Sequence, residues 1–466
     1  MDPRSLSDLA ALTGAAIVGD PDAAIGPDVV IDSRRVTPGA LFVAIKGERV
    51  DGHDFVDVAA AEGAGAVMGE HLLDTSLPQL VVADAVKGLS SLARGIVAEA
   101  RANGLRTIGI TGSAGKTSTK DLIAHVVETA GATVSPVGSF NNEVGVPLTA
   151  AAITRETQFL VSEMGARGSG HIAWLCSIVP PDVAVVINVG HAHVGEFGSV
   201  AAIAQAKGEL IEATASEGWA VLNDDDPLVS DMAARTSARI ARFAVGRPPV
   251  GTCQRAVWAT NIASQDERYA FDLHIDQTQA PVQLQVVGAH QVPNALAAAS
   301  VGAVLGLSIF AIAAALNDAR PRSRWRMEVA EGPGGLLVVN DAYNANPDSM
   351  AAALRTLAGL RRPSGRLVAV LGDMLELGDG AAGDHEAVGR LAAVLGVDDL
   401  IAVGAHAADL ARGFGANAIQ VADAGAALDA AKARSGPRAV VLVKASRGVA
   451  LETVAMRLLE SRGDAQ

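Results

Sequence analysis

The chain has 466 residues, of which half are apolar and only 3% are aromatic, and its formal net charge is −14 at pH 7. The length favours two to four domains over one. The acidic balance argues against a protein that coats nucleic acid, because such a domain would be basic. Two cysteines without a C-x-x-C pair give neither a disulfide framework nor a thiolate zinc site. The weakly apolar start lacks a small-residue cleavage site, so we expect no signal peptide and a cytoplasmic protein.

Residues 1–84 are predicted to form a small N-terminal α/β unit. Its segments 41–47 (LFVAIKG) and 79–85 (QLVVADA) are short, apolar and rich in branched side chains, which is typical of strands. A helical stretch from residue 86 to about residue 102 then leads into a second unit, which we place at residues 85–322.

The second unit alternates strands with helices, which predicts a doubly wound, mostly parallel sheet covered by helices. Its clearest strands are the short apolar runs TIGIT, QFLVSEMG and VAVVINVG, at residues 107–111, 158–165 and 183–190. Later in the same unit, apolar residues alternate with polar or small ones at 269–275, and the run VQLQVV follows at 282–287. This pattern predicts a hairpin-like antiparallel insert.

Residues 296–316 carry no charge and are long enough to be weighed as a membrane span. However, the segment is rich in alanine and is interrupted at Gly306 and Ser308, which suit a helix end and an N-cap. We therefore predict two buried helices of a globular core and no membrane insertion.

The strand and helix pattern starts again in a third unit, which we place at residues 323–466. Strands are predicted at LLVVN, RLVAVLG, DLIAVG and AVVLVKA, with alanine-rich helices between them. The fold class is therefore α/β with three domains: a small N-terminal α/β domain, a central domain with a phosphate-binding loop (P-loop), and a C-terminal Rossmann-like domain.

The strongest chemical signal is the segment TIGITGSAGKTSTKDLI, in which a strand leads through a glycine-rich turn into a helix. The glycines let backbone N–H groups point into one concavity, the helix N-terminus adds positive potential, and the lysine can reach terminal phosphates. The common phosphate loop begins with a glycine where this chain has Ile110, so a shorter variant is present. The pattern favours nucleotide binding, and the alternative interpretation is a glycine turn whose lysine is simply solvated. No N-K-x-D occurs to read guanine, which argues against a GTPase.

Several side chains near predicted strand ends are candidate metal ligands. The hydroxyl of Thr117 suits Mg²⁺, and Glu163 follows a buried strand at the edge where ligands gather in doubly wound sheets. His191 and His193 follow another strand, but zinc would need a third nitrogen or sulfur ligand, so a structural histidine and a Mg²⁺ neighbour both stay open. By local sequence alone, Lys207 is a solvated surface lysine.

Two amide-rich segments complete the set of candidates. GAHQVPNALAA places His290 and Asn294 one helical turn apart, and NDAYNANPDSM places Asp341, Tyr343 and Asn346 after a strand. Asn and Asp suit a turn, and they suit equally a loop that reads ribose hydroxyls and a base. Both interpretations stay open from the local sequence.

In this order, the motifs resemble those of the Mur ligases, and the resemblance covers nearly the whole chain. It rests on DSRRVTPGALFVAIKGERVDGHDF, TGSAGKTS, SEMGARG, NVGHAHVGEFGS, AKGEL, GAHQVPNALAA, SRWRMEV and NDAYNANPDS. Within the family, SFNNEVGVP, DAYNANPDSM, LGDMLELG and VKASRG resemble the member that adds D-alanyl-D-alanine, and the D-N-P-R motif of the diaminopimelate-adding relative is absent.

The resemblance implies a role for each matching residue. It places the ATP phosphates at Gly112, Ser113, Ala114, Gly115, Lys116, Thr117 and Ser118. It places the rest of ATP at Asn294, Arg326, Asp341, Tyr343 and Asn346. It implies metal sites at Thr117, Glu163, His193 and Lys207, with Lys207 carbamylated, and catalytic roles for Lys116, Lys207 and Arg326. The UDP-linked substrate would contact Ser33, Arg34, Asn141 and Asn142, with residues 51–53 near the UDP end, and the incoming dipeptide or the phosphate would contact Lys444, Ser446 and Arg447.

The resemblance also implies a reaction and a division of labour. The N-terminal domain would bind the UDP-sugar-peptide, the central domain ATP, and the C-terminal domain the incoming dipeptide and part of ATP. The expected reaction joins D-alanyl-D-alanine to UDP-N-acetylmuramoyl-tripeptide through an acyl phosphate, with ATP and Mg²⁺, in peptidoglycan precursor synthesis. We expect a monomer.

Two departures and two rival interpretations remain. EMGARGSGHI lacks the Asn and Pro associated with that loop, and Gln291 stands where relatives often have Asn, which leaves the role of His290 open. One rival is another ligase of the superfamily, such as a folylpolyglutamate synthase or the diaminopimelate-adding enzyme, and the DSRRV…DGHDF unit argues against the folate member. The other is a nucleotide-binding regulatory protein without turnover.

Overall fold

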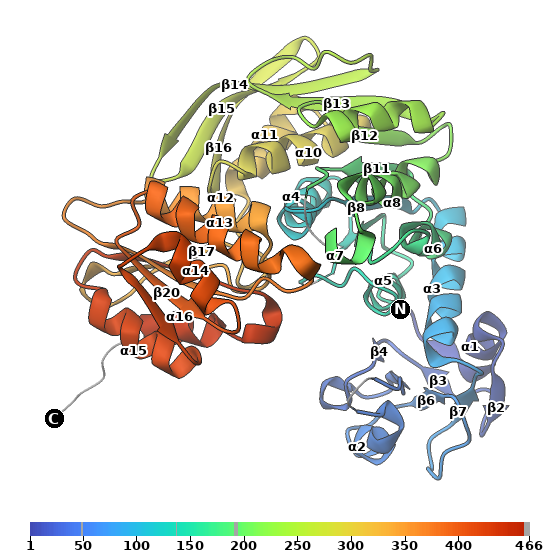
Figure 1. Cartoon of the computed structure of the whole chain (residues 1–466). Coiled ribbons are helices and arrows are strands. Elements are labelled where there is room, and N and C mark those ends of the chain that lie inside the picture. The colour runs from blue at the N-terminus through green and yellow to red at the C-terminus, as the bar shows by residue number, and fades with distance from the viewer. Residues whose placement is uncertain (48–49, 137, 191–193, 461–466) are drawn as a thin grey trace.

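The computed structural model describes residues 1–47, 50–136, 138–190 and 194–460, which fold into three α/β units, each built on its own main sheet. Figure 1 shows the N-terminal unit at the lower right, the central unit above it and the C-terminal unit at the lower left. The predicted fold class, with three α/β units and a mostly parallel central sheet, is confirmed. The exact boundaries of 1–84, 85–322 and 323–466 stay predictions.

The N-terminal unit contains a five-stranded sheet in the order β2-β7-β6-β5-β4, in which β2 alone is antiparallel to its neighbour. Its strands are β2 (Ala16–Val18), β4 (Val29–Val30), β5 (Leu41–Val43), β6 (Ala66–Gly69) and β7 (Gln79–Val81). A small pair, β1 (Arg4–Ser5) and β3 (Ala24–Ile25), and the helices α1 (Leu6–Thr13) and α2 (Val56–Ala61) complete it. The strand predicted to reach residue 85 ends at Val81, because Asp84 caps the next helix, α3 (Ala85–Ala102).

The central sheet has nine strands in the order β16-β15-β14-β13-β12-β11-β8-β10-β9. The strands are β8 (Arg106–Thr111), β9 (Thr133–Val134), β10 (Phe159–Glu163), β11 (Val183–Val186), β12 (Trp219–Asn223), β13 (Arg239–Val245), β14 (Arg255–Gln265), β15 (Arg268–Ile275) and β16 (Thr278–Val287). The pairs from β9 to β14 are parallel and the last three strands are antiparallel, so the predicted hairpin-like insert is confirmed.

Helices cover both faces of this sheet, because its central strands are apolar on both sides. In β11, Val183 and Val185 pack with α4 (Lys116–Glu128), α10 (Gln291–Val304) and α11 (Ile309–Asp318), whereas Ala184 and Val186 pack on the opposite face. The opposite face is covered by α5 (Gly145–Ala151), α6 (His171–Ile178) and α8 (Val200–Glu212), and two short helices, α7 (Val194–Phe197) and α9 (Pro227–Ser230), lie nearby.

The uncharged segment 296–316 forms the helices α10 and α11 with a break between them. Gly306 adopts a φ of +89°, and the side chain of Ser308 accepts a hydrogen bond from the backbone of Ala311 as the N-cap of α11. Nearly all of the α10 side chains are buried in the core. Among the described residues, no helix is both long enough and apolar enough to cross a membrane.

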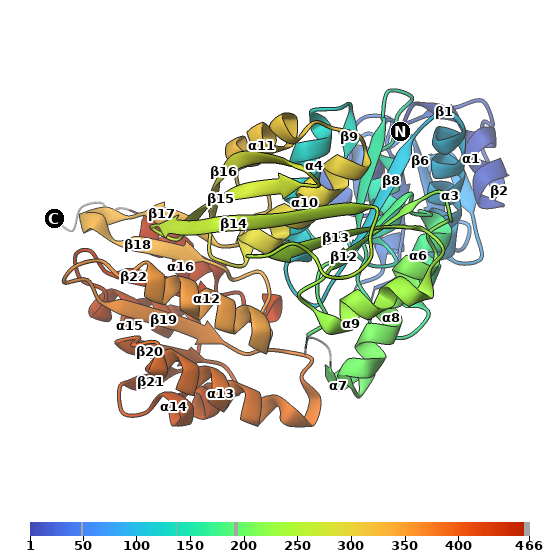
Figure 2. The same ribbon diagram turned by 90° about the horizontal axis from the view of Figure 1, so that it is seen from above.

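The C-terminal sheet has six strands in the order β17-β18-β22-β19-β20-β21, and only β17 is antiparallel. The strands are β17 (Glu328–Glu331), β18 (Leu337–Asn340), β19 (Leu367–Gly372), β20 (Asp399–Val403), β21 (Ala418–Val421) and β22 (Val440–Lys444). Figure 2 shows the sheet with helices on both faces. They are α12 (Pro347–Gly359), α13 (Ala381–Val394) and α14 (Ala407–Phe414) on one face, and α15 (Ala424–Arg434) and α16 (Glu452–Leu459) on the other.

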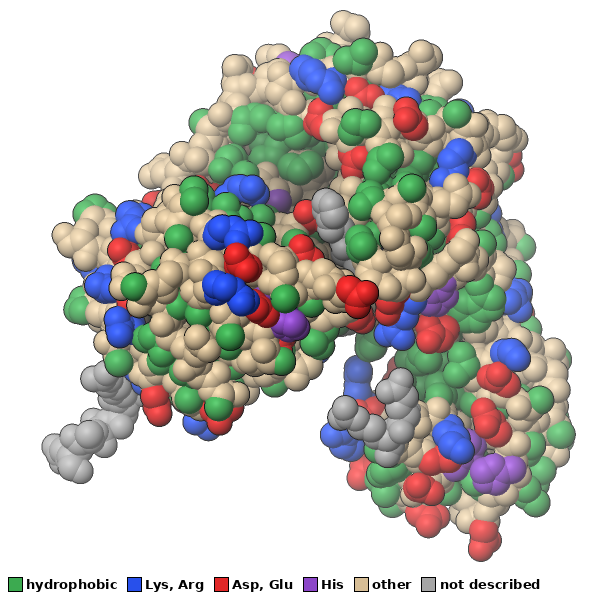
Figure 3. All heavy atoms as spheres, in the orientation of Figure 1, with side chains coloured by type: hydrophobic (Ala, Val, Ile, Leu, Met, Phe, Trp, Pro, Cys, Tyr) green, Lys and Arg blue, Asp and Glu red, His purple; other side chains and the backbone are tan. Residues whose placement is uncertain are grey.

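Helix α3 joins the N-terminal unit to the central one. It packs on α1 of the N-terminal unit and on α5 and α6 of the central unit, so one hydrophobic cluster runs through both units. The C-terminal unit has two clusters of its own. In the space-filling view, an open gap separates the C-terminal unit at the left from the N-terminal unit at the lower right (Figure 3).

Candidate active site

The glycine-rich turn lies between β8 and α4, as the sequence predicts. Gly115 adopts a φ of +81° at the N-terminus of α4, and a Cβ atom there would lie 2.9 Å from the Oδ1 atom of Asn294 on α10. The φ favours glycine, because other residues rarely adopt it, and a Cβ atom would also force the side chain of Asn294 to move. The turn therefore brings Asn294 against the backbone that precedes Lys116.

A side chain that the sequence did not single out, Asn188, holds this turn. Its Oδ1 atom accepts hydrogen bonds from the backbone N–H groups of Ser113 and Ala114, both at 2.9 Å, and its Nδ2 atom donates to the carbonyl of Ala114 at 3.0 Å. Asn188 follows β11, which pairs in parallel with β8, so the two strand ends meet at the same edge of the sheet. The signal in the sequence is a polar side chain near the end of the predicted strand run at residues 183–190.

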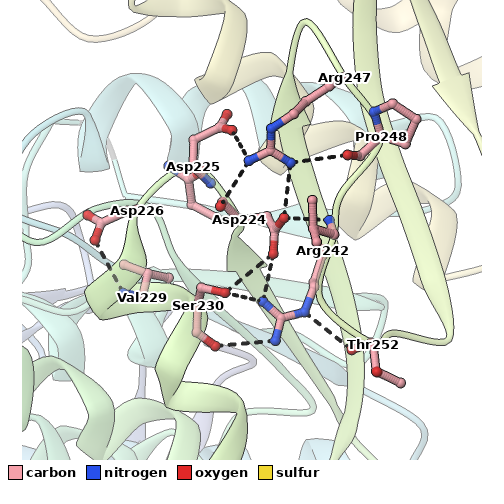
Figure 4. Close-up of polar contacts among 11 residues, drawn as sticks. Asp224, Asp225, Asp226, Val229, Ser230, Arg242, Arg247, Pro248 and Thr252 are labelled. Atoms are coloured by element: carbon pink, nitrogen blue, oxygen red, sulfur yellow. Dashed lines mark hydrogen bonds and ion pairs between the residues drawn. The ribbon is translucent and has the colours of Figure 1, made fainter.

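The segment that carries Asn188 is itself braced from the end of β12. Asn223 donates to the carbonyl of Ile187 at 2.9 Å, and the Asp226 carboxylate accepts from the N–H of Val189 at 2.7 Å. Figure 4 shows the polar network beside Asp226, in which the guanidinium of Arg242 pairs with the carboxylate of Asp224 at 2.9 Å. Burial raises the pKa of Asp224, but hydrogen bonds from backbone N–H groups and Arg247, together with the charge of Arg242, bring it below its usual value.

Hydroxyl and carboxylate oxygens converge beside the turn. The hydroxyl of Thr117 donates to Oε2 of Glu163 at 2.9 Å and lies 2.5 Å from the hydroxyl of Ser139, and Asn141 donates to Oε1 of Glu163 at 2.8 Å. Glu163 ends β10, is 1% exposed and precedes a loop, as predicted. Oxygen atoms are the ligands that Mg²⁺ prefers, so this set suits that ion. Among the described residues, no group of three or more His, Cys, Asp or Glu side chains lies close enough to hold one metal ion.

The lysine of the turn, Lys116, lies beside these oxygens. Its Nζ atom donates to the carbonyl of Gly112 at 2.7 Å, so the side chain folds back over the turn. Burial lowers the pKa of Lys116, and nearby Arg326 lowers it further, while Glu163 raises it. A phosphate placed at the turn would add negative charge that favours the ammonium form.

Arg326 reaches this site from the segment that connects the central and C-terminal units. Its Nη2 atom donates to the hydroxyls of Thr117 and Ser139 at 3.1 and 2.9 Å, and its guanidinium stacks on the ring of Tyr343 at 4.1 Å from the centroid. The same segment is held by α4, because the carboxylate of Asp121 accepts from the N–H of Ser323 at 3.0 Å.

Lys207 is buried, which contradicts the surface position that its local sequence predicts. The side chain on α8 is 3% exposed, and burial, assisted by Lys116, lowers its pKa well below the usual value. Within the described part of the chain, no acceptor or carboxylate pairs with its amine. The error arose because the burial depends on the packing of α8 over the sheet, which the local pattern does not encode.

Two cavities meet at the glycine-rich turn. The smaller has a volume of about 160 Å³ and is lined by the turn, α10, the end of β18 and α12. The larger has a volume of about 380 Å³ and extends between the central and C-terminal units. Residues that line both are Ala114, Gly115, Thr117, Arg326 and Ser349. A phosphate chain that enters from the smaller cavity would therefore end in the larger one.

An ion pair lies deep in the smaller cavity. The Nζ atom of Lys444 donates to Oδ2 of Asp341 at 2.5 Å and to the carbonyl of Asn344 at 2.8 Å, and Oδ1 of Asp341 accepts from the N–H of Met327 at 3.1 Å. Burial lowers the pKa of Lys444, whereas Asp341 raises it. His290 lines the same cavity, and burial lowers its pKa as well.

The sequence matches Mur ligase domains along most of its length. Residues 28–109 match the catalytic domain of the Mur ligase family, residues 110–302 the Mur ligase middle domain, and residues 325–447 the Mur ligase glutamate ligase domain. One relative is the UDP-N-acetylmuramoyl-tripeptide--D-alanyl-D-alanine ligase of Mycobacterium tuberculosis (strain ATCC 25618 / H37Rv). The two sequences are 43% identical over a match 505 residues long, gaps included, that covers 98% of this chain and 97% of that protein. The chain belongs to the Mur ligase family.

Solved Mur ligase structures share the fold. MurF from Acinetobacter baumannii is 31% identical with a TM-score of 0.87, and the match covers 99% of this chain and 100% of that chain. MurF ligase from Thermotoga maritima, solved in complex with ADP, is 29% identical with a TM-score of 0.76, over 93% of this chain and 96% of that chain.

The remaining residues implied by the Mur ligase resemblance fall into three groups. Asn141, Asn142, Ser446 and Arg447 line the larger cavity with Tyr343 and Asn346, whereas Ser118 lines the smaller one with Lys444. Asn346 also caps α12, because its side chain accepts from the N–H of Ser349. His191 and His193 lie outside the described residues.

The third group lies in the N-terminal unit. Ser33 is buried, Arg34 is exposed and pairs with Asp32 at 2.7 Å, and His53 is held by Asp51 at 2.6 Å. An apolar groove of about 390 Å³ lies next to the segment of Ser33 and Arg34, lined by residues 29–32 and Arg35 of the N-terminal unit and by residues of the central unit. Ser33 and Arg34 are thus separate from the phosphate site in this Mur ligase.

Proposed function

We propose that this Mur ligase uses ATP to join D-alanyl-D-alanine to the terminal carboxylate of UDP-N-acetylmuramoyl-tripeptide, in the synthesis of peptidoglycan precursors. The observation that carries the proposal is the phosphate-binding turn shared by two cavities. The smaller cavity presents the polar side chains of Asn294, Asp341 and Lys444 beside the turn, which suit the nucleoside part of a nucleotide. The other leaves room for two further reactants next to the terminal phosphate.

The reaction follows from the chemistry of the two reactants. A carboxylate does not react with an amine at neutral pH, because the oxygen that must depart is a poor leaving group. Attack of a carboxylate oxygen on the γ-phosphorus of ATP expels ADP and gives an acyl phosphate. The amine of D-alanyl-D-alanine then attacks the acyl carbon, loses a proton and expels phosphate. Both steps concentrate negative charge, which Lys116 and Arg326 are placed to stabilise.

Mg²⁺ suits the oxygens of Thr117, Ser139 and Glu163, which lie within hydrogen-bonding distance of one another. When bound, the ion would screen the charge of the transferred phosphoryl group. His193, the other ligand that the resemblance implies, lies outside the described residues.

Lys207 carries a carbamate in this proposal. A neutral lysine amine adds to CO₂ and loses a proton, and the product offers two oxygens for a second Mg²⁺. Three features support this: the burial of the amine, the lowered pKa, and the absence of a carboxylate partner in the described residues. Growth of a ¹³C carbamate signal in ¹³C-bicarbonate, lost in Lys207→Ala, is the expected result. Identical spectra for the wild type and Lys207→Ala would show that Lys207 carries no carbamate.

Asp341 and Asn294 contact the nucleoside of ATP in the smaller cavity, and the larger cavity takes the tripeptide along Asn141 and Asn142 and the dipeptide along Ser446. The UDP end of the sugar-peptide lies in the apolar groove near Ser33 and Arg34. The protein works as a monomer in the cytoplasm, where ATP and the UDP-linked precursors are available.

Release of phosphate tests the function directly. With ATP, UDP-N-acetylmuramoyl-tripeptide and D-alanyl-D-alanine together, we expect steady release of one phosphate per peptide bond formed. Omission of any one of the three should stop product formation. Turnover that needs neither peptide substrate would contradict the proposal.

A further inference from the structure

The larger cavity has two walls that belong to different units. The wall of the central unit contains Asn141, Asn142, residues 165–167 and His171, and the wall of the C-terminal unit contains residues around Tyr343, Leu375 and Ser446. The carboxylate that receives the phosphoryl group must lie beside Lys116, which belongs to the central unit. The proposed function therefore places the tripeptide along the central wall, where the groups on that wall would face its side chains.

Arg167 stands out on this wall. Three arginines line the cavity: Arg167, Arg326 and Arg447. Arg326 is held by two hydroxyls and a ring, and Arg447 pairs with Glu452 at 2.6 Å and lies 4.2 Å from the ring centroid of Trp325. Within the described part of the chain, nothing accepts a hydrogen bond from the guanidinium of Arg167, which is exposed to the cavity.

The loop that carries Arg167 is nevertheless held in place. The N–H of Arg167 donates to Nδ1 of His171 at 3.2 Å, and the carboxylate of Glu209 accepts from the N–H groups of Gly170 and Ala173 at 2.6 and 3.0 Å. This is the loop EMGARGSGHI, which lacks the Asn and Pro associated with it in the family. Because the backbone that carries this guanidinium is already held in place, an anion that binds here would cost little further loss of conformational entropy. The loop is therefore preorganised for an anion.

We propose that Arg167 binds a carboxylate of the sugar-peptide that takes no part in the reaction. This rests on the proposed function. A ligase from Acinetobacter baumannii with the same fold, 30% identical with a TM-score of 0.84, is named for a substrate containing alanyl-D-glutamyl-2,6-diaminopimelate. A glutamyl residue keeps one free carboxylate whichever carboxyl forms the peptide bond, and diaminopimelate keeps one besides the reacting group. Either would form a charge-assisted, two-pronged contact with a guanidinium.

The test compares three tripeptide substrates. The first contains glutamate and diaminopimelate, the second has lysine in place of diaminopimelate, and the third has the free carboxylate of the glutamyl residue converted to an amide. For Arg167→Gln, we expect kcat/KM for the first substrate to fall about tenfold to a hundredfold, through KM, because a charge-assisted contact is lost. KM for ATP and for D-alanyl-D-alanine should not change. The kcat/KM of Arg167→Lys should lie between those of the wild type and Arg167→Gln, because lysine keeps the positive charge but cannot donate two parallel hydrogen bonds to one carboxylate.

The substrates identify which carboxylate is bound. The wild-type protein should lose about the same factor on the substrate that lacks that carboxylate, and Arg167→Gln should not distinguish this substrate from the first. Arg355→Gln is the matched control, because Arg355 is exposed on α12 outside both cavities. It should behave as the wild type with all three substrates.

The affinities of the wild type and Arg167→Gln for the three tripeptides, measured by calorimetry, make the test independent of turnover. Equal affinities of the wild type and Arg167→Gln for every substrate would overturn the inference, as would an equal loss for all three. Failure of the wild type to form any peptide bond, with tripeptide binding still dependent on Arg167, would instead count against the proposed function.

Discussion

Replacement of Asn188 by alanine tests whether the phosphate-binding turn owes its shape to this side chain. The change removes two hydrogen bonds to backbone N–H groups of Ser113 and Ala114 and one to the carbonyl of Ala114. Each such bond contributes about 0.5–1.5 kcal/mol net, so the total is about 1.5–4.5 kcal/mol. Part of this is lost from the free energy of unfolding, and part appears as the cost of ordering the turn around phosphate. We expect the Kd for ATP to rise about tenfold to a hundredfold.

Isothermal titration with a non-hydrolysable ATP analogue and Mg²⁺ measures the effect, and the Kd for UDP-N-acetylmuramoyl-tripeptide alone should stay within about twofold. Asn317→Ala is the matched control, because Asn317 also accepts a backbone hydrogen bond, from Gln283 at 2.6 Å, far from the turn. Its affinity for the analogue should equal that of the wild type. An unchanged affinity in Asn188→Ala would show that the turn holds its shape without this side chain.

Three further changes separate nucleotide binding, catalysis and the linker. Lys116→Ala should lower kcat by at least about a thousandfold with no loss of melting temperature; retained turnover would refute the role of the turn. Arg326→Lys should lower kcat by about a hundredfold while the Kd for ATP changes little, because the contacts to Thr117 and Ser139 and the stacking on Tyr343 are lost. Glu128 pairs with Arg322 of the linker, which holds the pKa of Glu128 below its usual value of 4.5. Glu128→Gln should therefore lower the free energy of unfolding by up to about 1 kcal/mol at pH 7, and the difference should vanish as the pH falls through and below 4.5. A difference that does not shrink as the pH falls below 4.5 would refute this.

The sequence was sufficient for the parts of the site that lie in one segment. The turn from Gly112 to Thr117 and the position of Glu163 follow from a strand, a glycine-rich turn and a strand end, which are local patterns. The fold class followed from the alternation of strands and helices. The break between α10 and α11 was equally visible, because glycine and serine mark it.

The parts that depend on packing between segments were not predictable from local pattern. Lys207 looks like a surface lysine, and only the placement of α8 over the sheet buries it. Asn188 gains its role because β11 and β8 end side by side, and Arg326 because the linker crosses α4. The resemblance to the Mur ligases supplied the functional interest of Lys207 and Arg326, whereas the role of Asn188 and the guanidinium of Arg167, which has no partner among the described residues, emerged only from the structure.

Transfer of ¹⁸O from the tripeptide to phosphate tests the chemistry that the two cavities imply. If the terminal carboxylate of UDP-N-acetylmuramoyl-tripeptide carries ¹⁸O and attacks the γ-phosphorus, one labelled oxygen should leave in each phosphate released, as seen by ³¹P NMR or mass spectrometry. Phosphate without label, or label recovered in AMP, would contradict an acyl phosphate formed at the turn that contains Lys116.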